Sequence, residues 1–267
     1  MIAGRYVEKQ HVWEWLALGN FLMGGAGGGL YVTAHALALY TMVNNLELLS
    51  LLSITLVIAG LLCVMAEAGK PSRAMGVIRN LRTSWMSREA LFASGFIILA
   101  ALDTLILQNM ILRTIAWVSA LGYVVCQSFM LAASKKIPAW NTPATAPLFI
   151  TLSIATGAGI ISMINAAEVI SLIDTLLAIA VLVVGASYAA WPGATEYFRQ
   201  ALRREGNITY LAAGLLIVTL AIIPTVLHNN QLAAGLLLIA GTSVMKYTII
   251  IRMSYKLPVL PPLEAWH

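Results

Sequence analysis

Charged residues are scarce in this chain of 267 residues: Asp, Glu, Lys and Arg together make up only 10% of it. A soluble domain is usually about 25% charged, because water has to wet its surface. Hydrophobic residues make up 60% of the chain, and its mean hydropathy is +0.86. This composition excludes an ordinary soluble enzyme domain. It predicts an all-α integral membrane protein.

Cysteine and histidine are also too few for most resident redox centres. The chain has two cysteines, Cys63 and Cys126, whereas an iron–sulfur cluster takes about four thiolates. Among the histidines, His35 alone lies inside an apolar run, whereas a membrane b-haem is usually held by histidines from facing helices. We therefore expect no haem, no iron–sulfur cluster and no metal in this chain.

Long apolar runs divide the chain into spans, since a helix needs about 20 apolar residues to cross roughly 30 Å of hydrocarbon. Eight runs approach that length. They are Leu16–Tyr40, Leu48–Ala66, Ala90–Leu107, Ile115–Ala133, Pro147–Ile164, Val169–Ala190, Tyr210–Leu227 and Leu232–Ile251. We expect one membrane domain over residues 1–267. It would hold a first four-helix bundle at about 12–134, a second at about 145–252 and a cytoplasmic tail at 253–267.

The cationic residues predict the orientation of these spans. Fourteen of the sixteen Lys and Arg residues fall on one side of an eight-span protein. They are Arg5, Lys9, Lys70, Arg73, Arg79, Arg82, Arg88, Lys135, Lys136, Arg199, Arg203, Arg204, Arg252 and Lys256. Arg113 lies on the other side, and Lys246 lies inside the last span. The positive-inside rule then places both termini in the cytoplasm, in the cell's inner membrane. It also accounts for the basic composition without a nucleic-acid partner.

Three glutamates lie at the ends of the predicted spans. Glu14 opens the first span, Glu67 closes the second and Glu89 opens the third, so all three belong at the cytoplasmic end. An ionisable group inside a membrane costs a few kcal/mol and usually has a partner or a function. A solvated helix end is the competing interpretation for Glu14 and Glu89, and the residue types alone do not decide between the two.

Three more ionisable residues fall deeper in the spans. Asp103 lies in the third span, Lys246 midway along the eighth and His35 near the outer end of the first. They are candidates for a proton path. The alternatives are an ion pair between Asp103 and Lys246 and a hydrogen-bonded core histidine.

Glycines cluster in the first span. Gly24, Gly25, Gly27, Gly28 and Gly29 include two pairs spaced four residues apart. This spacing lets another helix or a flat ligand approach the backbone closely. Helix packing is the favoured interpretation.

The loop between the second and third spans carries more than charge. It contains Glu67-Ala-Gly-Lys-Pro-Ser-Arg-Ala74 and Arg79-Asn-Leu-Arg-Thr-Ser-Trp-Met-Ser-Arg-Glu-Ala-Leu91. A positive-inside anchor needs charge, and it needs neither Trp85 nor Asn80. These segments, with Ile137-Pro-Ala-Trp-Asn-Thr142, resemble the NrfD-like membrane-anchor subunits of the dimethyl-sulfoxide reductase and polysulfide reductase group. The length, the eight spans and the glycine-rich first helix agree with that resemblance.

The resemblance implies a division of labour. The anchor would bind a quinone (menaquinone or ubiquinone) beneath an iron–sulfur, ferredoxin-like subunit. That subunit would exchange electrons with a molybdopterin-type catalytic subunit holding molybdenum or tungsten. Because the glutamates face the cytoplasm, the catalytic subunit would be cytoplasmic too. It would oxidise an internal substrate such as sulfite or an aryl-acetyl thioester.

The resemblance also implies site residues. Quinone binding and proton exchange fall to Glu14, Asn20, Glu67, Lys70, Arg73 and Glu89. Partner docking falls to Arg79, Arg82, Trp85, Arg88, Lys135 and Lys136. Glu67 stands where members of the dimethyl-sulfoxide type carry a histidine, which leaves the proton-handling group open.

Two rival functions follow from the same residues. A secondary transporter would use Asp103, Asp174 and Lys246 along a path, with a helix broken at Pro224. A passive anchor would use Glu67 and Glu89 only to cap helices and bind the partner.

Overall fold

The structure is a computed structural model, and it describes residues 9–11, 13–39, 43–68, 81–164, 168–191, 193–227 and 230–257. These residues form helices and connecting loops with no strand among them. Lys9 and Tyr255 form one isolated antiparallel bridge.

Seven helices of the described residues are long and apolar enough to cross a membrane, which confirms a multi-pass helical protein. They correspond to the second to eighth predicted spans. In chain order they are α3 (Leu46–Ala68), α5 (Trp85–Leu102) with η3 (Asp103–Leu107), α6 (Met110–Ala132), α7 (Thr145–Ile164), α8 (Glu168–Ala189), α10 (Asn207–Leu220) with α11 (Ile222–Leu227), and α12 (Gln231–Tyr247) with η5 (Thr248–Arg252).

The first predicted span is not among those seven. It forms a helical run made of α1 (Trp15–Gly19), the π-helix η1 (Asn20–Gly24) and α2 (Gly25–Leu37). Its many glycines make it less apolar than the other spans. Every residue of α2 except Ala36 is buried. A helix enclosed by other helices does not need the apolar surface that lipid requires. By length and composition, the described structure therefore has seven candidate spans where the sequence predicts eight.

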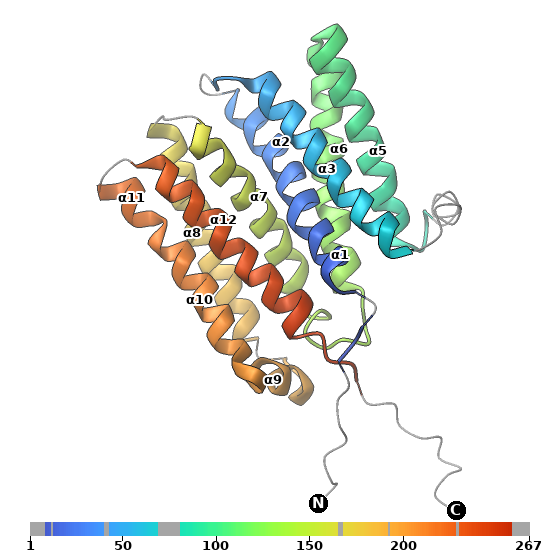
Figure 1. The fold of residues 1–267 in the computed structure, drawn as a ribbon, viewed down its shortest axis with the longest axis vertical. Coiled ribbons are helices and arrows are strands. Elements are labelled where there is room, and N and C mark those ends of the chain that lie inside the picture. The colour runs from blue at the N-terminus through green and yellow to red at the C-terminus, as the bar shows by residue number, and fades with distance from the viewer. Residues whose placement is uncertain are drawn as a thin grey trace, which may run out of the picture.

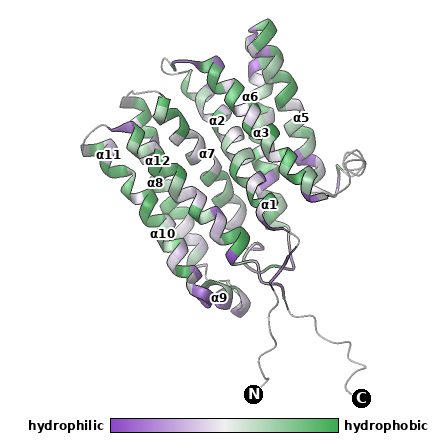
Figure 2. Cartoon of the chain, viewed as in Figure 1, coloured by the Kyte–Doolittle hydropathy of each residue, from purple (hydrophilic) through white to green (hydrophobic). Residues whose placement is uncertain are grey.

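The central position of this run organises the fold. Figure 1 shows α2 with α3, α5 and α6 on one side and with α7, α8, α10 and α12 on the other. The helix α2 packs on both α3 and α7, and α12 packs on α7 and α10. Figure 2 shows hydrophobic residues along the long helices and hydrophilic residues mainly toward their ends.

Close backbone contacts join α2 to its neighbours. A Cβ atom added at Gly29 would overlap the Ser153 carbonyl oxygen of α7, and one added at Gly157 would overlap the backbone at Gly29. On the other side, a Cβ at Gly27 would lie 2.6 Å from the Ser53 carbonyl oxygen of α3. At these positions the glycines serve helix packing, as their spacing predicts.

The seventh predicted span is interrupted near Pro224. The helix α10 ends at Leu220 and α11 begins at Ile222. Proline has no N–H to donate to the carbonyl four residues earlier, and its ring crowds that carbonyl. The interruption is the single residue Ala221, while Pro224 itself lies inside α11, and the two helices still form one candidate span.

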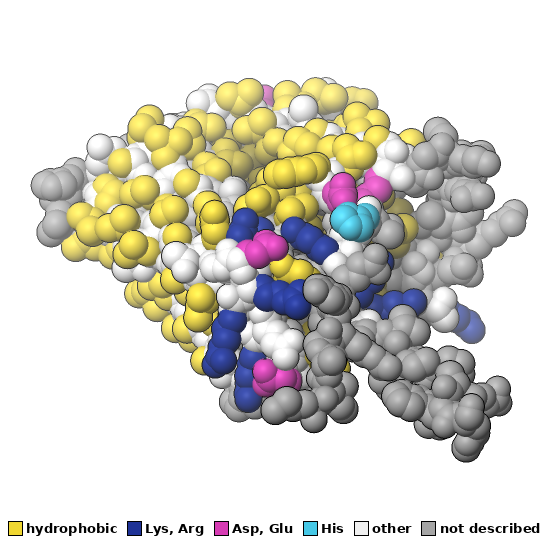
Figure 3. Space-filling model, turned by 60° about the horizontal axis from the view of Figure 1, so that its bottom comes forward, with side chains coloured by type: hydrophobic (Ala, Val, Ile, Leu, Met, Phe, Trp, Pro, Cys, Tyr) yellow, Lys and Arg dark blue, Asp and Glu magenta, His cyan; other side chains and the backbone are white. Residues whose placement is uncertain are grey.

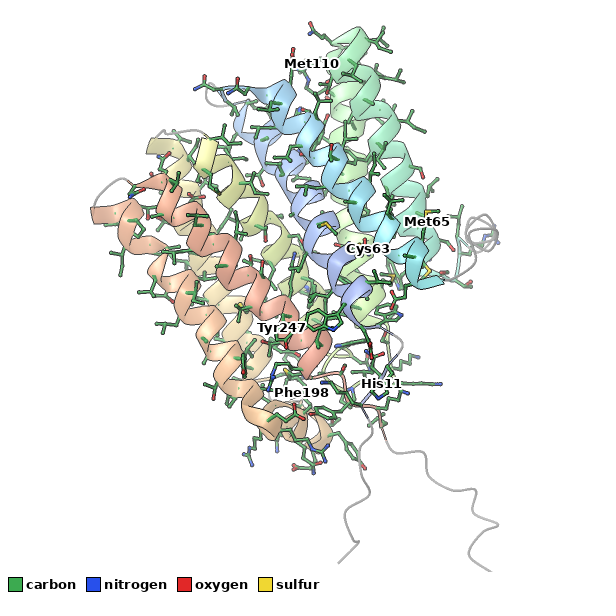
Figure 4. All side chains as sticks on the ribbon, viewed as in Figure 1. His11, Cys63, Met65, Met110, Phe198 and Tyr247 are labelled. Atoms are coloured by element: carbon green, nitrogen blue, oxygen red, sulfur yellow. The ribbon has the colours of Figure 1, made fainter. Side chains whose placement is uncertain are left out.

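Cations gather at one end of the molecule, where α1 begins, α6 ends and the short helix α9 (Glu196–Arg203) lies (Figure 1). Figure 3, which brings this end forward, shows Lys and Arg side chains grouped across it. We name it the basic face. Its described members are Lys9, Arg82, Arg88, Lys135, Lys136, Arg199, Arg203, Arg204, Arg252 and Lys256. Figure 4 places Met110 at the opposite end from His11 and Phe198.

Candidate functional site

A carboxylate is buried near the basic face. Glu89 lies in the second turn of α5, whose start is fixed by Ser84 accepting a hydrogen bond from the Ser87 backbone. Only 3% of Glu89 is exposed. Its Oε1 accepts a hydrogen bond of 3.2 Å from the Asn20 side-chain amide, and the Gln127 amide lies 3.5 Å away. A buried carboxylate is costly unless such donors reach it.

Gln127 and Tyr123 on α6 complete this polar cluster, and neither was predicted. Gln127 Nε2 lies 3.2 Å from the Asn20 carbonyl oxygen and 3.0 Å from the Tyr123 hydroxyl. The signal that could have identified Gln127 was an uncharged polar side chain well inside the fourth predicted span. The cluster therefore joins α5, α6 and the first helical run.

The backbone is irregular where this cluster meets the first run. Asn20 begins the π-helix η1, which ends at Gly24. Short π-helical turns inside α-helices occur frequently at functional sites. Asn20 is fully buried, and its Oδ1 has no hydrogen-bond partner among the described residues. A buried acceptor without a partner is uncommon and is available to a ligand or a water.

A narrow cleft lies beside Asn20. Its volume is about 20 Å³, room for about one water molecule. Its lining comprises Trp13, Ala17, Asn20, Phe21, Val64, Glu67, Met86 and Met130. A quinone ring would need Met86 and Met130 to move aside, which their flexible unbranched side chains allow.

Two of the predicted quinone residues line this cleft, and two more lie beside them. Asn20 and Glu67 line it, and Glu89 hydrogen-bonds to Asn20. Glu67 lies beside Glu14, interacting with its backbone N–H. Glu14 itself is exposed, and its carboxylate lies 3.1 Å from His11 Nδ1. Lys70, Arg73 and Arg79 were also predicted as functional residues, and they lie outside the described residues.

Lys246 lies on the other side of η1. Its ammonium donates to the Phe21 carbonyl at 3.0 Å and to the Ser153 hydroxyl at 3.3 Å, and the residue is fully enclosed. A methyl group added at Gly25 would lie 2.8 Å from Lys246 Nζ and 3.2 Å from Gln127 Oε1. Lys246 therefore faces the same small space as the Glu89 cluster.

Asp103 belongs to a separate cluster. Its Oδ2 accepts a hydrogen bond of 2.9 Å from Arg113 Nε. Arg113 lies in the first turn of α6, directly after the π-helix that begins with Asp103, so chain proximity brings the two together. The ion pair with Lys246 that the sequence left open does not form.

His35 also lies toward the end of the molecule opposite the basic face. Its Nδ1 lies 3.1 Å from the Tyr31 carbonyl oxygen, and its ring stacks on the Tyr31 ring at 3.9 Å. A hydrogen-bonded core histidine, one of the alternatives, is what the structure shows. The three residues predicted as a proton path are thus divided between two clusters.

Asp174, the other carboxylate of the transporter alternative, lies in a third place. Asp174 on α8 accepts a hydrogen bond from the Ser162 hydroxyl of α7. Asp103, Asp174 and Lys246 therefore have different partners on different helices. Within the described residues they do not line one path.

Some of the predicted docking residues are held by contacts within the chain, and others are exposed. Arg88 donates to the carbonyl oxygens of Leu81 and Arg82 at 2.8 and 2.6 Å and lies over the Trp85 ring. Trp85 in turn stacks on Phe129 at 4.8 Å. Both side chains hold the start of α5 in place. Arg82, Lys135 and Lys136 are exposed and available to a partner.

The basic face also contains a socket. It has a volume of about 420 Å³ and lies between the α6–α7 and α8–α9 connections. Lys135, Asn141, Trp191, Thr195 and Phe198 contribute to its walls. The first connection is held firmly, because Trp140 donates to the Ile249 carbonyl at 2.8 Å and Tyr188 donates to the Ala139 carbonyl at 2.7 Å.

Comparison with known proteins finds an informative similarity. No family model matches the chain. One of the subunits of a sulfite dehydrogenase from Allochromatium vinosum is 30% identical over 161 residues. The alignment covers 50% of this chain and 49% of that protein, so the chain spans about half the length of the relative it matches. Over that half, the chain is similar to a subunit of a sulfite-oxidising dehydrogenase.

Proposed function

We propose that this chain is the membrane-anchor, quinone-reactive subunit of a multisubunit oxidoreductase whose catalytic subunit holds a molybdenum or tungsten bis-pterin cofactor. One observation carries the proposal. Glu89 is buried inside a membrane helix, yet it is held by Asn20, which lines a narrow cleft together with Glu67. A carboxylate kept in such a place at an energetic cost has a function by default.

The proposed topology has eight spans, four on each side of the α2–α7 contact. The run Trp15–Leu37 would be the additional span, since its 23 residues give a rise of about 34 Å at 1.5 Å per residue. The basic face and both termini would lie in the cytoplasm, by the positive-inside rule.

The residues at the cleft suit the chemistry of a quinone, which takes up two protons together with two electrons. The side-chain amide of Asn20 and the unpartnered Oδ1 of the same residue can bind the quinone or quinol oxygens. Glu89 can hold a proton and pass it on, as buried carboxyl groups do in general acid–base catalysis. Glu67, half-exposed at the mouth of the cleft, is the next carboxyl toward water. Lys70 and Arg73 would act from the loop that follows α3.

The partner would be an iron–sulfur subunit that docks on the basic face. Exposed cations steer an acidic partner and fix its register. The socket beside Lys135 is suited to an anchoring side chain of that partner, because Trp191 and Phe198 supply apolar walls within a polar rim. The similarity to a sulfite dehydrogenase subunit favours sulfite over an aryl-acetyl thioester as the substrate of the catalytic subunit.

The test is Glu89→Gln in the intact complex, purified from its native membrane. The substitution keeps size and hydrogen bonding and removes the exchangeable proton. We expect substrate-dependent quinone reduction to fall by about 100-fold, within the range for general acid–base groups, while the partner subunits still co-purify. The matched control is Glu47→Gln. Glu47 lies at the opposite end of the protein and accepts a hydrogen bond of 3.1 Å from Gln108.

Other outcomes would support the rival functions. Full activity of Glu89→Gln, or loss of the partners, would favour a passive anchor. Purification of a solitary chain with no quinone in its lipid extract would favour a secondary transporter.

A further inference from the structure

A second polar cavity lies at the end of the protein opposite the basic face. It has a volume of about 500 Å³ and lies where the end of α2, the start of α3 and the start of α6 meet. Asp103, which pairs with the cavity residue Arg113, lies 14 positions after Glu89 along the helix, a rise of about 21 Å at 1.5 Å per residue. The cavity is therefore distinct from the cleft at Asn20.

Arg113 brings hydrogen-bond donors to this cavity, and the Asp103 carboxylate balances its positive charge. It lines the cavity, and its Nε is paired at 2.9 Å with the buried Asp103 carboxylate. The terminal guanidinium nitrogens have no hydrogen-bond partner among the described residues. Asp103 Oδ1 and the Tyr31 hydroxyl, both buried, also lack partners there. These two buried groups do not line the cavity, so the free donors that a ligand in it can reach are those of the half-exposed Arg113 guanidinium.

His35 brings an acceptor to the same cavity. Its Nδ1 lies 3.1 Å from the Tyr31 carbonyl, which can only accept a hydrogen bond. A neutral His35 ring must therefore carry its proton on Nδ1, and this leaves Nε2 as an acceptor. The cavity thus offers a donor on α6 and an acceptor on α2.

The remaining walls are apolar except for Thr114. Trp117 is fixed by its Nε1 donating to the Val32 carbonyl at 2.9 Å. Ala38, whose side chain is small, also lines the cavity. Leu39 and Met110, each 72% exposed, lead outward. The volume lies within the range of about 300–1,000 Å³ found for small-molecule sites.

We propose that this cavity is a second quinol-binding site, at the opposite membrane face from the reactive one. One oxygen of the ring accepts a hydrogen bond from the Arg113 guanidinium, and the hydroxyl at the other donates a hydrogen bond to His35 Nε2. The isoprenoid tail leaves past Leu39 and Met110 into lipid. Because Asp103 already neutralises Arg113, the site favours a neutral ring over an anionic phosphate head. The site binds and holds quinol, and no electron transfer is assigned to it. The choice of quinol as ligand rests on the proposed function.

The experiment is photolabelling of the intact complex in lipid nanodiscs with an azidoquinone, followed by mass spectrometry of the peptides. We expect label in peptides containing His35 to Leu39 or Met110 to Trp117, and separately in those that line the cleft at Asn20. Ala38→Trp fills the cavity, and His35→Phe removes the acceptor but keeps the ring. His35→Phe should lower the outer label by about tenfold, the worth of one hydrogen bond. Ala38→Trp should lower it at least as much by excluding the ring, and both should leave the inner label unchanged. Ala212→Trp, at an exposed site on α10, is the matched control.

The outcomes separate this inference from the proposed function. Inner label without outer label would overturn the second site alone. Absence of both labels would overturn the second site and the quinone function together. Outer label that anionic phospholipid displaces and unlabelled quinone does not would assign the cavity to a lipid instead.

Discussion

The side-chain amide of Asn20 donates a hydrogen bond of 3.2 Å to the Glu89 carboxylate, inside the protein and 69 residues away along the chain. Asn20 begins a π-helical turn and Glu89 lies in the second turn of α5. Local chain geometry does not bring these two residues together. Their meeting depends on how α5 and α6 pack against the first helical run, and Gln127 shows the same dependence.

Replacing Gln127 tests whether the buried amides position Glu89. Gln127→Met keeps the volume and removes the amide, so Glu89 keeps only Asn20 as a donor. We expect quinone reduction by the complex to fall by about tenfold, the worth of one hydrogen bond to a charged group. Ser128→Ala is the control, because the Ser128 hydroxyl bonds only to the Val124 carbonyl of its own helix. Equal activity of the two variants would show that Gln127 has no part in the site.

Gly29 tests the contact between α2 and α7. Its added Cβ would overlap the Ser153 carbonyl oxygen, so the two helices would have to separate. We expect Gly29→Ala to destabilise the protein by about 1–3 kcal/mol, as overpacking does, and to lower the midpoint of thermal unfolding in detergent. Gly95→Ala is the control, because the nearest atom to its added Cβ is Ser119 Oγ at 3.6 Å. An unchanged midpoint for Gly29→Ala would contradict the close packing.

The exposed lysines after α6 test the docking face. The double substitution Lys135→Glu with Lys136→Glu should weaken association of the partner subunits by about tenfold at low salt, because it reverses the local charge that steers an acidic partner. Added salt should weaken the unmodified complex in the same direction. Association is measured by titrating the separated partner against the chain in nanodiscs. Glu47→Lys, a charge reversal at the opposite end, should leave the affinity unchanged, and a similar loss in both would refute a localised docking face.

The eight-span topology is tested by cysteine labelling in a background with Cys63→Ala and Cys126→Ala. Lys9→Cys and Glu47→Cys flank the first helical run. If that run crosses the membrane, a membrane-impermeant maleimide reacts with Glu47→Cys in intact spheroplasts and with Lys9→Cys only in inverted vesicles. Reaction of both variants from the same side would show that the run Trp15–Leu37 does not cross.

Much of the fold can be predicted from hydropathy and charge summed along the sequence. Hydropathy over about 20 residues predicts the spans from α3 to α12. The charge of each loop predicts the grouping of Lys and Arg at one end. Asn20, Glu67 and Glu89 were predicted for the site, through a family resemblance, and the structure brings them together at one cleft.

Tertiary structure alone decided which polar groups meet. Lys246 donates to the Phe21 carbonyl, Asp103 pairs with Arg113, and Gln127 reaches Asn20. Membrane helices are apolar around most of their circumference, so the sequence pattern does not reveal which way each one is rotated about its axis. The rotation is set by small residues that let backbones touch, as at Gly29 and Gly157, and by buried polar groups that must find partners away from water.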